Sequence, residues 1–262
     1  MCNDKTRTMG AIRKALRGLR RKAPLPSPSG GVSKRPSKPR GSGFASAQLE
    51  KENEFARLSQ LSYEAEEGTG ADSAFARAFQ ASGLDRHYAV ESDLSNANHT
   101  TFRDTRTGRG VVAFRGSNVK NMGDMGTNAA IAFGLHRLTP RFREAEDVTR
   151  SAIARFGGKD NVDVTGHSLG GTQAMHATNR TGVHSYSFNP GAGLTRGQLS
   201  MMGLGVVGAT ASLLNRGRLD AGNAHVISTG VDPISMMSRA SGASHRYVVP
   251  RSADVHGIKN FV

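Results

Sequence analysis

Apolar residues recur at helical spacing in two stretches of the chain. In residues 47–66 the spaced positions are Leu49, Phe55, Leu58 and Leu61, with Tyr63 near the end, and glycines follow at positions 68 and 70. Side chains three or four positions apart share one face of a helix, so this spacing predicts an amphipathic helix. A shorter helix is expected over residues 72–81.

The second stretch begins at Thr139-Pro140, where a residue able to cap a helix precedes a proline at the first helical position. Its apolar positions follow one face: Phe142, Ala145, Val148, Ala152, Ile153 and Phe156. Gly157 is expected to end this helix, because glycine readily adopts the left-handed conformation that closes a last turn. A further helix is expected over residues 173–178.

Short apolar and β-branched runs predict strands between these helices. Gly110–Phe114 is an uninterrupted apolar run before a Gly-Ser turn, which is typical of a strand buried on both faces. The other expected strands are His87–Val90 and Thr100–Arg103, both at edges, and Val162–Thr165, Val183–Phe188, His225–Thr229 and Arg246–Val249. Strands that alternate with helices predict an α/β fold with a mainly parallel central sheet and helices on both faces.

The charge of the chain is concentrated at one end. The 262 residues include 35 Lys and Arg against 21 Asp and Glu, a formal net charge of +14. Residues 1–43 hold 12 of these basic residues and one acid, Asp4, whereas the rest of the chain is nearly balanced. A basic surface spread over the whole protein would favour nucleic acid as the partner. Because the charge is local and no RNA-binding motif accompanies it, we expect no nucleic-acid partner.

Residues 1–43 are expected to form a disordered basic tail, and residues 44–262 a single domain. In the tail, prolines alternate with Ser, Gly and basic residues, so the tail can bury too little apolar surface to offset the entropy lost on ordering. Ile12, Leu16 and Leu19 recur between basic residues, which would suit binding to an anionic membrane. The alternatives are a plain solubilising tail or an organellar transit peptide. With no secretory signal or transmembrane span predicted, we expect a soluble or peripheral membrane protein.

The candidate chemistry centres on Gly166-His167-Ser168-Leu169-Gly170-Gly171. A bare G-x-S-x-G pattern arises often by chance, but here it follows a predicted strand and runs into a predicted helix. That is the setting of a nucleophile elbow, in which glycine neighbours let the backbone turn sharply and expose the serine hydroxyl. Ser168 is therefore the candidate nucleophile, and the Leu169 N–H a candidate oxyanion donor. The alternative is a glycine-rich turn with a buried serine.

A nucleophilic serine needs a histidine base and an orienting carboxylate, which follow it along the chain in this kind of fold. Asp232 is favoured as the acid because it lies in a loop after a strand end, whereas Asp220 lies in a polar loop and Asp254 is too near the base in sequence. His256, in a loop of small residues, is favoured as the base over His245, which starts a predicted strand.

The second oxyanion donor should come from a loop after an earlier strand. Ser117 ends Phe114-Arg115-Gly116-Ser117 and is the natural candidate, the alternative being an ordinary turn at a strand end. Cys2 is the only cysteine and no histidine pair has metal-binding spacing, so neither an internal disulfide nor a metal site is expected.

Three blocks of the chain resemble the class 3 lipase family of α/β-hydrolases. Residues 112–117 are similar to its oxyanion strand and loop, residues 164–171 to its nucleophile block, and Asp232 and His256 fit its acid and base. The resemblance implies hydrolysis of glyceride or phospholipid esters, without a cofactor, by a Ser168–Asp232–His256 triad. It also implies an oxyanion hole from Ser117 and Leu169, with Asp124 supporting the Ser117 loop. The chain departs from the family at Met125, where tryptophan is common.

Substrate choice is expected to involve residues 199–214, an uncharged stretch between the nucleophile and the acid. It is too short to span a bilayer, and we interpret it as an apolar lid or interfacial segment, the alternative being a buried core helix or hairpin.

The leading hypothesis for the function of the protein is a lipase or a phospholipase of A type. A serine peptidase or thioesterase would use the same elbow. The alternative from another class is a catalytically inactive hydrolase fold whose basic tail binds a membrane or a partner.

Overall fold

The computed structural model describes residues 42–65, 68–117, 139–191, 223–232 and 243–262. Four of the predictions made above fall outside these ranges: the basic tail up to residue 41, Asp124, Asp220 and the apolar segment 199–214. They stay predictions.

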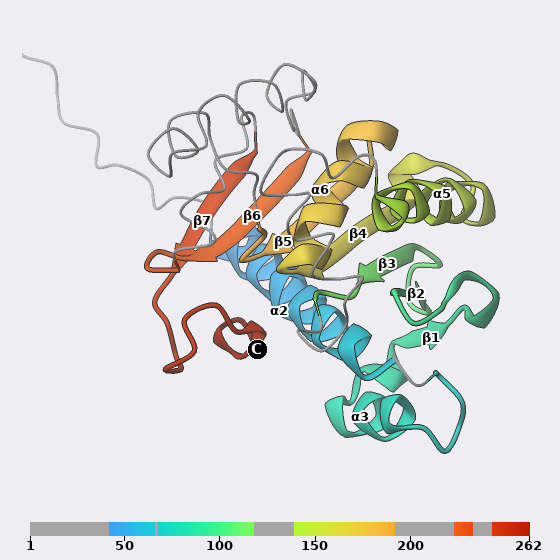
Figure 1. The fold of residues 1–262 in the computed structure, drawn as a ribbon, viewed down its shortest axis with the longest axis horizontal. Coiled ribbons are helices and arrows are strands. Elements are labelled where there is room, and N and C mark those ends of the chain that lie inside the picture. The colour runs from blue at the N-terminus through green and yellow to red at the C-terminus, as the bar shows by residue number, and fades with distance from the viewer. Residues whose placement is uncertain (1–41, 66–67, 118–138, 192–222, 233–242) are drawn as a thin grey trace, which may run out of the picture. The chain divides into compact units, whose positions relative to one another are not determined.

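A seven-stranded sheet forms the centre of the described fold, and its strands lie side by side in the order in which they occur along the chain (Figure 1). They are β1 (Tyr88–Val90), β2 (His99–Asp104), β3 (Gly110–Phe114), β4 (Val162–His167), β5 (His184–Phe188), β6 (Ala224–Thr229) and β7 (Ser244–Val248). The first three strands pair antiparallel and β3 to β7 pair parallel. The mostly parallel sheet confirms the α/β fold class.

Helices connect and cover these strands. They are α2 (Ser42–Glu64), α3 (Ala74–Ser82), α5 (Pro140–Arg155) and α6 (Leu169–Thr181), with short 3₁₀ helices η2 (Leu84–Arg86), η3 (Ser92–Leu94), η5 (Lys159–Asn161) and η6 (Ile258–Asn260). Crossovers between neighbouring parallel strands are right-handed, so α5, between β3 and β4, and α6, between β4 and β5, lie on the same face of the sheet. As predicted, Gly157 follows α5 in the left-handed conformation, with φ +75°.

Side chains of β3 separate the two halves of the core. Val111 and Ala113 pack in the cluster that includes Phe55 and Leu58 of α2, whereas Val112 and Phe114 pack in the cluster formed with α5 and α6. Successive side chains of a strand point to opposite faces, so α2 covers one face of the sheet and α5 and α6 cover the other. This confirms a strand buried on both sides and helices on both faces.

Two local expectations were wrong. The strand predicted over Thr100–Arg103 is not an edge, because β2 pairs with β1 on one side and β3 on the other. The first long helix starts at Ser42 rather than residue 47, because its opening turns carry Ala and Gln, which favour a helix without forming an apolar face. Leu49 is 47 % exposed, so the buried face of this helix begins later than the apolar spacing indicates.

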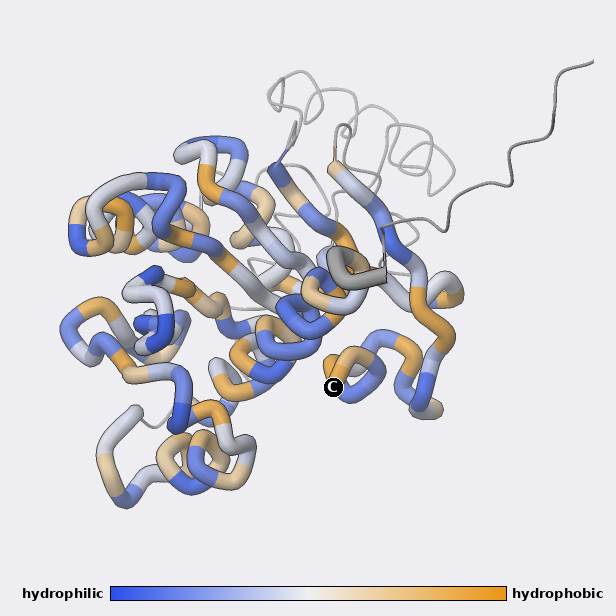
Figure 2. Tube along the Cα trace, turned by 180° about the vertical axis from the view of Figure 1, so that it is seen from behind, coloured by the Kyte–Doolittle hydropathy of each residue, from blue (hydrophilic) through white to orange (hydrophobic). Residues whose placement is uncertain are grey.

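Three hydrogen bonds between side chains join α2 to β4, and we call them the α2–β4 polar contacts. They are Lys51 Nζ to Asp163 Oδ2 at 3.0 Å, Ser59 Oγ to Thr165 Oγ1 at 2.8 Å, and Tyr63 Oη to His167 Nδ1 at 2.8 Å. The β4 residues in these contacts, at positions 163, 165 and 167, are two positions apart. Their side chains therefore point to the same face of the sheet, the face that α2 covers. Figure 2 shows hydrophilic and hydrophobic positions alternating around the helix that crosses the sheet. The last contact leads directly to the residue before Ser168.

Candidate active site

Ser168 occupies a sharp turn between β4 and α6. Its backbone has φ +57°, a left-handed conformation that non-glycine residues rarely adopt. A Cβ atom on Gly166 would overlap the backbone of Gly170, and one on Gly170 would overlap the Phe114 carbonyl oxygen. The turn is therefore possible only with glycine at these two positions, as expected for a nucleophile elbow.

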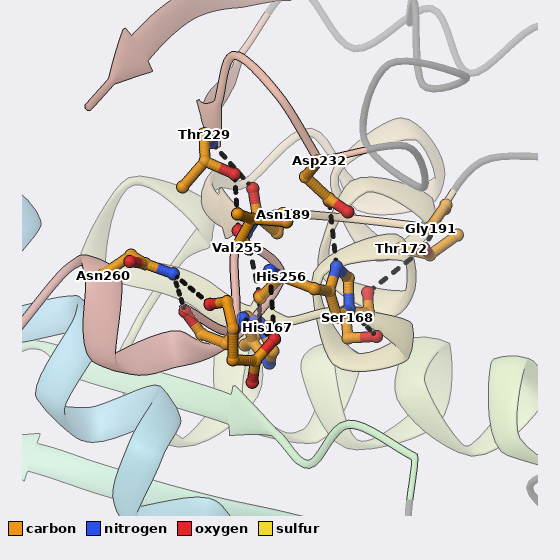
Figure 3. Close-up of polar contacts among 12 residues, drawn as sticks. His167, Ser168, Thr172, Asn189, Gly191, Thr229, Asp232, Val255, His256 and Asn260 are labelled. Carbon is orange, nitrogen blue, oxygen red and sulfur yellow. Dashed lines mark hydrogen bonds and ion pairs between the residues drawn. The ribbon is translucent and has the colours of Figure 1, made fainter. Parts of the chain in front are cut away.

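The structure brings Ser168, His256 and Asp232 into one hydrogen-bonded line (Figure 3). His256 Nε2 lies 2.8 Å from Ser168 Oγ, and His256 Nδ1 lies 2.9 Å from Asp232 Oδ2. Exposure rises along the line, from 1 % for the Asp232 side chain to 23 % for that of His256. A buried acid beside a partly exposed histidine and a partly exposed serine suits a nucleophile activated by a histidine.

The other candidate acid and base lie elsewhere. His245 is an exposed residue of β7, paired in register with Val226 of β6. Asp254 is exposed, and its Oδ1 accepts the backbone N–H groups of His256 at 3.2 Å and Gly257 at 3.1 Å. Asp254 therefore shapes the loop that carries His256 instead of contacting its ring.

Asn189 ties the loop of His256 to the sheet, a role that the sequence does not reveal. Its Nδ2 donates to the carbonyls of Val255 at 3.2 Å and His256 at 2.8 Å, and its Oδ1 accepts the Thr229 N–H at 2.9 Å. Thr229 Oγ1 also donates to the Val255 carbonyl at 2.6 Å. Asn189 has φ +39°, a conformation that asparagine tolerates better than most residues. The only feature of the local sequence that could have pointed to Asn189 is its position directly after β5.

His167, beside the nucleophile, is buried and linked at both ring nitrogens. Nδ1 lies 2.8 Å from the Tyr63 hydroxyl and Nε2 lies 2.7 Å from the His256 carbonyl oxygen. Burial lowers the pKa of His167 to about 4, because the charged ring would lose its hydration. The ring is therefore neutral at pH 7.

We expect this buried histidine to make the protein less stable in acid. The unfolded chain protonates it near pH 6.5, but the folded protein does so only near its lowered pKa of about 4. Between these values the unfolded state binds more protons, so the free energy of unfolding falls by about 1.4 kcal/mol per pH unit on acidification. Urea unfolding at pH 7 and pH 5 measures the loss.

The matched control for acid unfolding is His167→Gln, which cannot titrate. His99 and His225, whose pKa values burial also lowers, contribute equally in both proteins. The variant should therefore lose about 2 kcal/mol less than the wild type between pH 7 and pH 5. Equal losses would show that His167 titrates normally in the folded state.

The two candidate oxyanion donors lie at the start of α6 and in the loop after β3. Leu169 is the first residue of α6, where backbone N–H groups lack partners within the helix, and its side chain packs against Phe142. Ser117 is partly buried at the end of the described loop after β3. This loop is held by Arg141 of α5, whose Nη2 donates to the Arg115 carbonyl at 2.9 Å, a contact that the sequence does not predict. Asp124 lies outside the described residues.

A hollow of about 860 Å³ lies at the opposite ends of the strands from Ser168, lined by residues that include Lys51, Asp163, His184 and His225. In open α/β sheets ligands bind at the carboxyl ends of the strands, where the elbow is, so this hollow is not the expected substrate site.

Among the described residues, no group of three or more His, Cys, Asp or Glu side chains is arranged to hold a metal ion. No helix in the described ranges is long and apolar enough to cross a membrane.

Comparison with known proteins identifies the family. Residues 54–222 match the phospholipase-like family described as the Tle-like phospholipase domain. No curated protein matches the chain. The match includes the elbow but ends before Asp232 and His256, and it does not test the narrower resemblance to class 3 lipases. Because the matched residues make up more than half of the chain, the protein belongs to the family of Tle-like phospholipase domains, a phospholipase-like assignment that implies a lipid hydrolase.

Proposed function

We propose that the protein hydrolyses acyl esters of lipids, as a lipase or a phospholipase of A type, through a Ser168–His256–Asp232 triad and an acyl-enzyme. The observation that carries the proposal is the position of the His256 ring, within hydrogen-bond distance of both Ser168 Oγ and Asp232 Oδ2. The phospholipase-like family supports the lipid substrate.

In the first half-reaction, Ser168 Oγ attacks the ester carbonyl carbon while its proton passes to His256 Nε2. Asp232 accepts the His256 Nδ1–H, which keeps the ring in the tautomer with a free Nε2 and stabilises the imidazolium that forms. The Leu169 N–H, together with Ser117, would stabilise the negative charge on the carbonyl oxygen. The tetrahedral intermediate then collapses, and the alcohol part of the lipid leaves with the proton from His256.

In the second half-reaction, water replaces the alcohol. His256 takes a proton from the water as it attacks the acyl-serine, and a second tetrahedral intermediate forms in the same oxyanion hole. Its collapse releases the fatty acid and returns the proton to Ser168. Apart from water and the lipid, every step uses groups of the chain itself, so the proposed mechanism includes no cofactor.

The competing hypothesis is an inactive hydrolase fold that binds a membrane or partner through its basic tail. An inactive relative is expected to have lost at least one of the contacts in the serine–histidine–acid line. The described residues keep both contacts at ordinary hydrogen-bond distances, which favours an active enzyme.

The substrate class is tested by incubating the full-length protein with phosphatidylglycerol and phosphatidylcholine vesicles, a triglyceride emulsion and a soluble short-chain ester. We expect free fatty acid and lysophospholipid from the vesicles in equal amounts, because one ester bond of the phospholipid is cut. Mass spectrometry of the extracted lipids identifies both products.

Each other outcome corrects the proposal. Fatty acid from the emulsion alone would identify a triglyceride lipase. Hydrolysis of only the short-chain ester would remove the lipid substrate. No hydrolysis of any of the four substrates would favour the inactive binding protein.

A further inference from the structure

The loop that carries His256 has little regular structure to hold it. Residues 249–257 follow β7 and precede η6, and their backbone is fixed by contacts from other elements. The His256 carbonyl oxygen accepts two of these contacts, from Asn189 Nδ2 at 2.8 Å and from His167 Nε2 at 2.7 Å. The residue that holds the reacting imidazole is thus anchored through its own carbonyl group.

The chemistry of the partners determines where the protons lie. A carbonyl oxygen only accepts hydrogen bonds, so His167 Nε2 must carry a hydrogen and donate it to His256. The buried ring is neutral, and its Nδ1 therefore has a free lone pair, which accepts the Tyr63 O–H at 2.8 Å. Tyr63 thereby favours the one tautomer of His167 that can hold the His256 carbonyl.

We propose that Tyr63 and His167 are positioning residues that set the His256 imidazole against Ser168. This inference rests on the proposed function, because it gives a role to residues outside the triad. The chain of contacts runs from the Tyr63 hydroxyl to the His167 ring and from there to the His256 backbone. Neither Tyr63 nor His167 exchanges a proton with the substrate.

Small displacements of the base have large effects on rate. A misplacement of about 1 Å of a catalytic group lowers a rate by on the order of 100-fold. The carbonyl and the imidazole of His256 belong to one residue, so releasing the carbonyl frees both the backbone and the ring to shift. Asn189 still holds the same carbonyl when His167 is changed, so the loop should loosen without leaving the site.

The α2–β4 polar contacts provide a matched pair of variants. Tyr63→Phe and Ser59→Ala each remove one hydroxyl from the face of α2 that contacts β4. The Ser59 contact ends at Thr165, which keeps a hydrogen bond to the Tyr186 carbonyl at 2.9 Å. Only the Tyr63 contact continues to His256, so a general loosening of α2 would affect both variants, and a positioning role only Tyr63→Phe.

A second pair of variants tests His167 itself. His167→Leu removes the donor to the His256 carbonyl, whereas His167→Gln supplies an amide N–H that can reach it. We expect kcat on a soluble ester to fall about 100-fold in His167→Leu with KM nearly unchanged, and His167→Gln to recover most of the loss. Tyr63→Phe should lose about fivefold, the worth of one hydrogen bond, and Ser59→Ala should match the wild type.

The position of the base can be read without turnover. In the wild type, the proton between His256 Nδ1 and Asp232 should give a far-downfield proton NMR signal, and it should broaden or vanish in His167→Leu. Reaction of Ser168 with a fluorophosphonate probe should slow in parallel with kcat. Equal kcat values for Tyr63→Phe and Ser59→Ala, or for His167→Gln and His167→Leu, would overturn the positioning role.

Failure of this inference is distinguishable from failure of the proposed function. If the wild type hydrolyses the ester and Ser168→Ala does not, the triad holds whatever the Tyr63 and His167 variants do. If the wild type and Ser168→Ala are equally inactive, the proposed function fails first. Should His167→Leu not fold, the comparison of Tyr63→Phe with Ser59→Ala still decides the matter.

Discussion

Replacing Ser168 with alanine should lower kcat for ester hydrolysis by about 10⁶-fold, as loss of a triad serine does elsewhere. The variant has no oxygen to form the acyl-enzyme, and His256 then has no hydroxyl to deprotonate. Little change in stability is expected, because alanine tolerates the left-handed turn about as well as serine does. The measurement is kcat on a soluble ester and on phospholipid vesicles, with thermal unfolding recorded on the same samples.

Ser151→Ala is the matched control for this variant, because Ser151 lies exposed on α5 and its hydroxyl contacts only its own helix, through the Asp147 carbonyl. It should keep full activity and full labelling by a fluorophosphonate, whereas Ser168→Ala should lose both. If Ser168→Ala kept even about 1 % of the wild-type rate, another residue would have to be the nucleophile.

The Asp232→Asn variant should lose about 10⁴-fold in kcat while keeping the backbone intact. The asparagine side chain is as large as the acid it replaces, but its amide N–H₂ can face His256 and hold the ring in the wrong tautomer. His256 Nε2 would then carry a hydrogen and could not accept the proton of Ser168. The missing carboxylate would also leave the imidazolium of the transition state without its counter-charge.

Asp254→Asn is the matched control, since it makes the same chemical change two residues from the base. The side-chain carbonyl of asparagine can still accept the N–H groups of His256 and Gly257, so the loop should keep its shape. We expect at most a severalfold loss of kcat. A larger loss in Asp254→Asn than in Asp232→Asn would make Asp254 the functional acid.

Much of the fold is predictable because its signals are local. A few neighbouring residues are enough to predict several elements. These are the apolar run of β3, the Thr139-Pro140 start of α5 and the glycine-rich turn around Ser168. The elbow is therefore identifiable from the sequence without knowledge of any distant contact. The glycines at 166 and 170 are required by close backbone packing, and the glycine-rich motif after a strand indicates that requirement directly.

The support around the site is not predictable in this way, because its contacts are distant in sequence. Tyr63 and His167 are 104 positions apart, and His167 and the His256 carbonyl are 89 apart. Asn189 looks like an ordinary residue after a strand until the loop of His256 is placed against it. The exposed Leu49 shows the converse: an apolar residue at the expected spacing does not lie in the core.

The order of the strands also has a consequence during synthesis. Each strand from β2 to β7 adds beside the one made just before it, so the sheet can grow from one edge as the chain leaves the ribosome. The elbow is then formed after β4, well before Asp232 follows β6 and His256 follows β7. A partly synthesised chain that ends before residue 256 therefore has the serine but not its base. On the proposed mechanism, it cannot hydrolyse an ester until the loop after β7, which carries His256, is in place.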